Sequence, residues 1–247
     1  RDLRMSRGLG DVYKRQMKYR ETLTPDSFYV SLKGLEQWAE TTDKPMDRAV
    51  LNSLIAGIYA DYASSNRWQI RRRTNIVDET PSSDIREWSS NMFVQQVMKY
   101  TAGSLQDTGL LLNTSSRIYI PFVKLGDTSE YYHHDMLHLL GSRGVDALNN
   151  VMGLDKDSVV QTSVENVYLG MLDAYEKAGM DDGYVLCKLD YLNWKRNSDP
   201  TFVPYRAPQN LIGLTQDPYL AGLDKLKADF KSHDVCACLL YTSDAAD

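Results

Sequence analysis

The sequence has few of the residues that build covalent or metal-stabilised frameworks. It holds three cysteines and four histidines in 247 residues. Cys187 and Cys236 lie too far apart to indicate a zinc knuckle, and Cys238 adds no disulfide framework. Hydrophobic runs are also short, because no window approaches the ~18 uninterrupted apolar residues of a membrane span. We therefore expect an intracellular, cytoplasmic chain that has no membrane partner.

Positive charge is also scarce. The chain has 28 Lys and Arg against 33 Asp and Glu, which gives a net charge of −5. A nucleic-acid binder usually has a broad basic surface, so we expect no nucleic-acid partner. The sequence also lacks a phosphate-binding loop, a dinucleotide glycine fingerprint and a nucleophile elbow. Several common enzyme classes are therefore without support, and no catalytic residue can be assigned.

Neither end of the chain has helical or strand periodicity. The stretches DVYKRQ, at 11–16, and CLLYTSDAAD, at 238–247, can be reverse-translated into the two strands of a transposon end that is used to tag DNA for sequencing. Segments of technical origin are set aside before a fold is predicted. We predict that residues 1–16 and 238–247 are disordered, translated adapter sequence. Residues 17–237 are then a single domain that need not include either natural terminus.

Helical signals dominate residues 17–237. Pro25 and Pro45 stand at the expected first positions of two striped helices, the first over about 25–40. Further helices are expected from Ser83 or Asp84 to Gly103, over SEYYHHDMLHLLG, over VDALNNVMG, up to Gly179 and over about 217–231. The stretch YVLCKLDYLNW fits neither a helix nor a strand period cleanly.

Two short β-prone runs interrupt the helical pattern. They span 110–112 and 118–123, and the polar residues 113–116 separate them as in a hairpin. The predicted fold class is therefore mainly α, or α+β with a small β-hairpin element. We expect one globular domain of about six to seven helices.

The histidines form the most concentrated chemical signal. His134 and His138 are four residues apart, so on a helix they share one side and can bind one divalent metal, such as zinc, with Asp135 beside them. Further ligands would come from the later helix, from Glu165, Asp173 or Glu176. Alternatively, His134 acts as a general base. The favoured interpretation is plainer: the leucines of this stretch build a core, and the histidines are polar residues at its margin.

The stretch HDMLH resembles the HDxxH zinc motif of a helical family of ubiquinone biosynthesis. In that family a glutamate follows the second histidine at a fixed distance, and here Asn150 stands at that position. The resemblance covers under twenty residues and does not establish membership.

A second signal is the basic and aromatic stretch RWQIRRR. It could grip phosphates and stack on a base. In an acidic chain, a solvated loop or a contact with a partner protein is the better interpretation. The candidate contact residues are Arg67, Trp68, Arg71, Arg72 and Arg73.

The function that fits these observations best is a non-enzymatic structural or protein-interaction (assembly) protein, of the kind found in viruses and phages. The chain holds sixteen tyrosines, and tyrosine and arginine are favoured at protein interfaces. We therefore expect a protein partner or self-assembly. The alternative is a metal-dependent enzyme that uses the HDxxH stretch.

Overall fold

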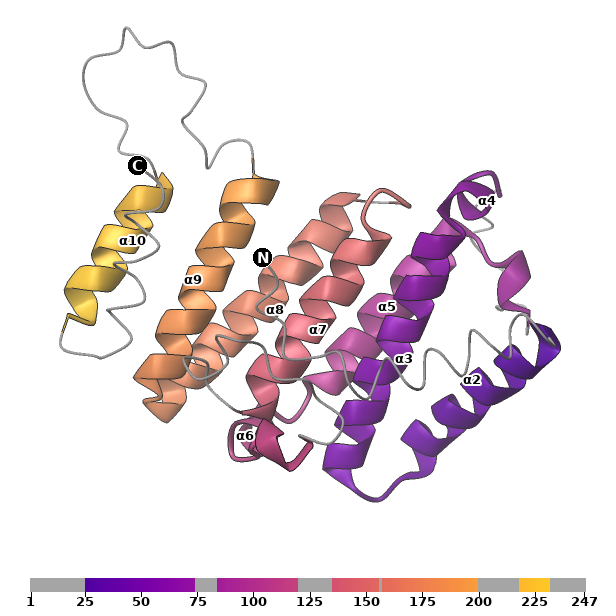
Figure 1. Ribbon diagram of the computed structural model, residues 1–247, viewed down its shortest axis with the longest axis horizontal. Helices are drawn as coiled ribbons and strands as arrows, with labels where there is room; N and C mark the ends of the chain where they lie inside the picture. The colour runs from indigo at the N-terminus through magenta and orange to yellow at the C-terminus, as the bar shows by residue number, and fades with distance from the viewer. Residues whose placement is uncertain (1–24, 74–83, 120–134, 156, 200–217, 232–247) are drawn as a thin grey trace, which may run out of the picture. The chain divides into compact units, whose positions relative to one another are not determined.

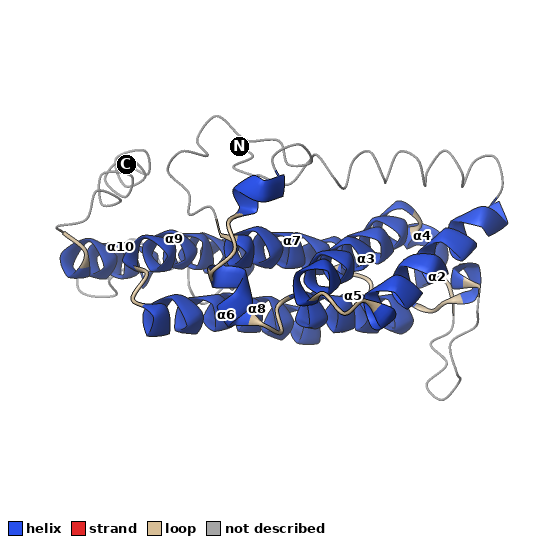
Figure 2. Cartoon of the chain, turned by 90° about the horizontal axis from the view of Figure 1, so that it is seen from below, coloured by secondary structure: helices blue, strands red, loops and turns tan. Residues whose placement is uncertain are grey.

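The computed structural model describes residues 25–73, 84–119, 135–155, 157–199 and 218–231, without the side chains of 25–28. The predicted adapter segments, 1–16 and 238–247, lie outside these ranges. The described part is mostly helical and includes seven α-helices of twelve residues or more. Figure 2 shows helices and loops, and no strand, among these residues. The mainly α prediction is therefore confirmed.

The chain divides into two compact units. The first contains residues 1–129 and 134–167, and the second contains residues 130–133 and 168–247. The boundary falls inside one helix, α8 (Asp157–Ala178). Because the units share this helix, the expectation that 17–237 form a single domain stays a prediction.

The first unit is built around α3 (Pro45–Ser65), which contacts α2 (Pro25–Thr41), α5 (Ser90–Ser104) and α7 (Met136–Val151) (Figure 1). The first unit also contains two five-residue helices: α4 (Arg67–Arg71), which follows α3, and α6 (Thr108–Leu112), which contacts α7. Two 3-10 helices, η1 (Ile85–Glu87) and η2 (Ser116–Tyr119), lie between the longer elements. The predicted starts at Pro25 and Pro45 are confirmed.

Helix α3 is apolar around much of its circumference, which is why several helices can pack on it at once. Many of its buried residues are small, so neighbouring helices can approach closely. The buried positions of α3 are Ala49, Leu51, Ser53, Leu54, Ile55, Ala56, Ile58, Tyr59, Ala60 and Ala63.

Aspartate side chains mark three helix starts in this unit. Asp84 accepts a hydrogen bond from the backbone N–H of Arg86 at 2.9 Å, and Asp107 accepts one from Leu110 at 3.0 Å. Asp135 is buried and caps α7 in the same way. Each cap satisfies a backbone donor that the first helical turn leaves without a partner.

The expected β-hairpin is not found among the described residues. Leu110, Leu111 and Leu112 lie in α6 instead, and η2 occupies 116–119. The Asp107 cap starts α6, and the side chains of Asn113 and Thr114 bond to carbonyls one turn back, at 2.8 Å each. These local hydrogen bonds favour a helical turn over an extended strand. The remainder of the second predicted run, 120–123, lies outside the described residues.

Three further expectations differ from the structure. The helix expected from Ser83 or Asp84 to Gly103 is interrupted, because η1 ends at Glu87 and α5 begins at Ser90. The stretches SEYYHHDMLHLLG and VDALNNVMG, which we expect to form two helices, contribute to one continuous helix, α7. Gly141 and Gly144 are buried inside this helix and do not end it. The ambiguous stretch YVLCKLDYLNW is helical, within α9 (Asp181–Ser198). Asp181 and Asp182 occupy the first turn of α9, where carboxylates stabilise the helix dipole.

In the second unit, α10 (Pro218–Asp229) packs against α9. Leu192, Tyr219 and Leu223 form a buried apolar cluster between them, and the Tyr219 hydroxyl donates to Asn193 Oδ1 at 2.9 Å. Gly179 ends α8 with a positive φ of 64°. The N–H groups of Gly179 and Met180 return to the carbonyls of Glu176 and Tyr175, a Schellman motif, which confirms the predicted stop.

Within the described residues, no helix has both the length and the apolar character that a membrane span requires.

The α5–α7 contact provides a stability test. A Cβ on Gly144 would lie 2.7 Å from Thr101 Cγ2, whereas a Cβ on Gly34 of α2 would meet nothing within 4 Å. Thr101 is buried and β-branched, so it has little freedom to move aside. We expect Gly144→Ala to lower the free energy of unfolding by about 1–3 kcal/mol.

The matched control, Gly34→Ala, should raise the free energy of unfolding by about 0.5–1 kcal/mol, because alanine restricts the unfolded chain in an exposed helix. Urea titration of the two variants measures both values. A Gly144→Ala protein as stable as the wild type would show that α5 and α7 do not meet at this residue.

Candidate functional site

The stretch RWQIRRR forms a short helix that is held firmly on its inner side. Ile70 is fully buried and anchors α4 in the core. The Arg67 guanidinium donates from Nη1 to the Met152 carbonyl at 2.5 Å and from Nη2 to the Asn150 carbonyl at 2.9 Å. These carbonyls belong to the C-terminal end of α7, where a cation is favoured by the helix dipole. Arg67 therefore has a structural role.

Two more contacts fix this segment. A Cβ on Gly153, which follows α7, would lie 3.0 Å from Arg67 Nη1, so glycine leaves the room that the arginine needs. The Arg73 Nη1 donates to the Trp88 carbonyl at 3.0 Å. Two of the four arginines that the sequence singled out are thus committed to backbone carbonyls of the same unit.

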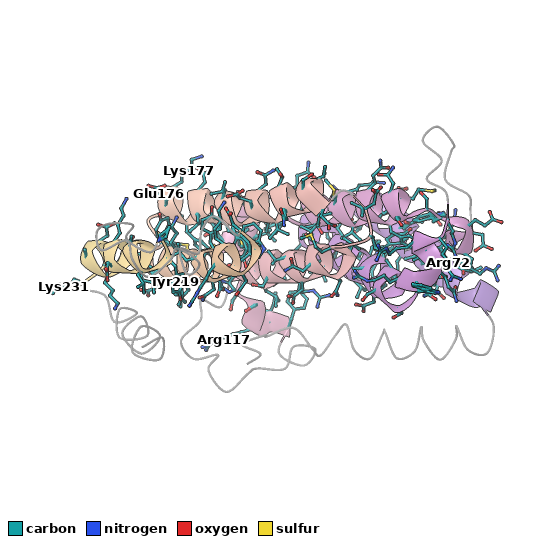
Figure 3. All side chains as sticks on the ribbon, turned by 90° about the horizontal axis from the view of Figure 1, so that it is seen from above. Arg72, Arg117, Glu176, Lys177, Tyr219 and Lys231 are labelled. Carbon is teal, nitrogen blue, oxygen red and sulfur yellow. The ribbon has the colours of Figure 1, made fainter. Side chains whose placement is uncertain are left out.

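The other three candidate residues face outward. Trp68 is 69% exposed, and Arg71 and Arg72 are exposed too. The Arg72 guanidinium carbon lies 4.5 Å from the centroid of the Trp68 ring, a cation–π contact between residues one helical turn apart. We call Trp68, Arg71 and Arg72 the α4 surface. Figure 3 labels Arg72 at the end of α4.

A second exposed apolar feature lies on α2. Val30 is 73% exposed and Trp38 is 54% exposed. Gly34 stands midway between them, and the three are spaced four residues apart, so they share one side of the helix. The buried residues Leu32, Leu35 and Ala39 hold the opposite side of α2 against the core. We call Val30, Gly34 and Trp38 the α2 stripe.

A cluster of tyrosines around one carboxylate links α2 to its neighbours. Glu36 Oε1 accepts hydrogen bonds from the hydroxyls of Tyr59 on α3, at 2.6 Å, and Tyr100 on α5, at 2.9 Å. The rings of Tyr59 and Tyr100 lie 5.9 Å apart, and Trp88 stacks on Tyr59 at 5.2 Å. One carboxylate thereby ties three helices together.

This cluster raises the pKa of both phenols. Burial, followed by the hydrogen bond and charge of Glu36, raises the pKa of Tyr59 above its usual 10.0. Burial and the same carboxylate raise the pKa of Tyr100. The two phenols therefore remain protonated as hydrogen-bond donors to Glu36, and neither is poised as a general base near neutral pH.

The histidine stretch is placed only in part. His133 and His134 lie outside the described residues. Helix α7 begins at Met136, later than expected, and Asp135 precedes it as the N-cap. Asp135 Oδ1 accepts a hydrogen bond from the His138 backbone N–H at 2.7 Å. His138 itself is buried at the start of the core-facing side of α7, at 7% exposure.

The proposed further metal ligands are found at separate places. Glu165 is half-buried on α8 in the first unit, whereas Asp173 is exposed and pairs with Lys177 at 2.7 Å. Glu176 is exposed as well. Within the described ranges, no three His, Cys, Asp or Glu side chains gather into a group that could hold a metal ion. Metal binding by His134 and His138 stays a prediction, which metal analysis of the wild type, His134→Ala and His138→Ala tests.

Sequence reasoning missed the Glu36 cluster and the α2 stripe. Glu36, Tyr59 and Tyr100 come from three separate helices, so no local motif contains them. The α2 stripe has a local signal, since Val30 and Trp38 fall on the side opposite to Leu32, Leu35 and Ala39.

No family model, no curated protein and no solved structure matches the chain.

The Glu36 cluster predicts a specific loss of stability in alkali. Tyr59 and Tyr100 have raised pKa values in the folded state, so the folded chain keeps their protons when the unfolded chain loses them. The contribution of these two protons to the free energy of unfolding is complete below pH 10.0, the usual pKa of tyrosine in the unfolded chain. It is lost as the pH rises above that value. Each tyrosine should lower the free energy of unfolding by about 1.4 kcal/mol per pH unit in that range.

Tyr59→Phe isolates one of these protons. Near pH 8 the variant should be less stable by about 0.5–1.5 kcal/mol, because the hydrogen bond to Glu36 is gone. Its stability should fall less steeply above pH 10, so that the two curves cross about one pH unit higher. Urea titrations across this range give both curves, and parallel curves would contradict the cluster.

Proposed function

We propose that the chain is a non-enzymatic protein-interaction protein that binds a protein partner, or a second copy of itself, through the α4 surface. The observation that carries the proposal is Trp68, which is 69% exposed on a helix whose other side is fixed to the core. Ile70 and Arg67 hold α4 in place without any contribution from Trp68. Within the described residues, the anchoring of α4 therefore does not depend on a tryptophan at this position.

The composition of the α4 surface suits a protein interface. Tryptophan and arginine are the residues most enriched where truncation to alanine costs the greatest binding energy. Trp68 supplies a large apolar area with few rotatable bonds, and Arg71 and Arg72 supply planar donors at its edge. Because α4 is held by buried contacts, little conformational freedom is lost on binding.

The α2 stripe supports the same function. Trp38 is a second large aromatic side chain that the core leaves exposed, on a helix that Leu32 and Leu35 anchor. Gly34 leaves open space beside it, so the backbone of a partner can approach α2 closely. Aromatic side chains such as these are enriched at protein interfaces relative to the rest of the protein surface.

Selection from a random peptide display library tests the proposal without knowledge of the natural partner. We expect the purified chain to enrich a peptide family whose affinity falls at least about tenfold in Trp68→Ala, as for a hot-spot residue. The matched control is Val159→Ala, which removes a 41% exposed apolar side chain from α8 in the same unit. It should leave affinity unchanged.

Light scattering of the wild type and Trp68→Ala covers the case in which the partner is a second copy. The proposal would be wrong if Trp68→Ala changed neither peptide binding nor oligomeric state while both variants remained folded by circular dichroism.

A further inference from the structure

We infer that the partner segment of the α4 surface is acidic and carries apolar side chains. This inference rests on the proposed function and names the chemistry of the partner. It starts from the different contacts that the four arginines of RWQIRRR make. Arg67 and Arg73 donate to backbone carbonyls, whereas Arg71 and Arg72 project from the exposed side of the segment.

The two exposed arginines have no counter-charge within the described part of the chain. No carboxylate of the described residues forms an ion pair with Arg71 or Arg72. Arg86, by comparison, pairs with Asp84 at 2.6 Å. In a chain of net charge −5, two adjacent exposed arginines that form no ion pair with a described carboxylate make a local positive surface. Such a surface attracts a negatively charged segment and lowers its affinity for basic ones.

Trp68 adds an apolar requirement to this charge. Arg72 lies against its ring at 4.5 Å from the centroid, and the side chain is still 69% exposed. The ring thus holds the guanidinium in position for a carboxylate, and its remaining area is free to pack against an apolar side chain. A purely acidic segment would leave that area in water. A segment that alternates acidic and apolar residues satisfies both parts of the α4 surface.

The same chemistry fits a protein segment better than nucleic acid. Binding along a phosphate backbone needs a positive groove that follows several nucleotides. The α4 surface offers two exposed arginines, because Arg67 and Arg73 are held by carbonyls. Two exposed charges are too few to hold a polyphosphate strand in this way.

Fluorescence anisotropy with a labelled peptide of Glu-Glu-Leu repeats tests the inference on the full chain. We expect saturable binding that weakens about tenfold in the double variant Arg71→Ala/Arg72→Ala and by a similar factor in Trp68→Ala. Raising the salt from about 50 to about 200 mM should weaken wild-type binding several-fold, because both exposed charges are screened. A Lys-Lys-Leu peptide of equal length should not bind.

The matched control is Arg196→Ala. Arg196 also lies over an aromatic ring, at 4.7 Å from the centroid of Tyr219, but Tyr219 is only 4% exposed, so its ring offers a partner little apolar area. Affinity should not change in this variant. Circular dichroism checks that every variant is folded.

Three results of the anisotropy experiment would each overturn the inference. They are no binding of the acidic peptide, equal binding by Arg71→Ala/Arg72→Ala and the wild type, or tighter binding of an oligothymidylate of equal charge at the same residues. If library-selected peptides still depend on Trp68 but carry no acidic residues, the inference fails while the proposed function stands. If no peptide depends on Trp68 and the oligomeric state is unchanged as well, the proposed function fails with it.

Discussion

The burial of α3 on several sides is the constraint on which the rest of the first unit depends. A helix with a single apolar face packs against one layer, but α3 is apolar or small around much of its surface and packs against α2, α5 and α7. Its continuation into α4 then follows from two contacts, Ile70 in the core and Arg67 on the end of α7. The position of Trp68 is therefore set by core packing, although Trp68 itself does not belong to the core.

Local signals in the sequence were sufficient where one segment decides its own structure. Pro25 and Pro45 start helices because proline fits the first helical turn, and Gly179 ends α8 because glycine adopts positive φ at little cost. Local signals gave the wrong structure for 110–112. Three leucines in a row have the composition of a strand, but here they follow the Asp107 cap and lie in a helical turn. Leu111 is fully buried in that turn, and its helix, α6, contacts the later helix α7. Periodicity over three residues cannot report such a contact.

The candidate site shows the same division. The composition of RWQIRRR indicated a binding segment, but it could not separate the arginines that hold the fold from those that face outward. That separation is made by the carbonyl of Met152, which lies 85 residues from Arg67 in the sequence, and by that of Trp88 beside Arg73. Likewise, three helices bring Glu36, Tyr59 and Tyr100 together, and no spacing rule connects their positions.

The buried anchors of α2 and α4 also explain how the first unit can combine a rigid interior with surfaces suited to binding. Trp68 and Trp38 lie on helices that buried residues hold in place: Ile70 anchors α4, and Leu32 and Leu35 anchor α2. The Glu36 carboxylate, held by two phenols that keep their protons, adds a polar tie that positions α2 against α3 and α5. A partner that covers Trp68 or Trp38 therefore meets side chains already held in place, and binding need not reorganise the core. The anchors and the exposed residues are different positions on the same helices. Replacing an exposed tryptophan therefore removes apolar surface available to a partner and leaves the anchor intact. Single substitutions can thus separate the two roles.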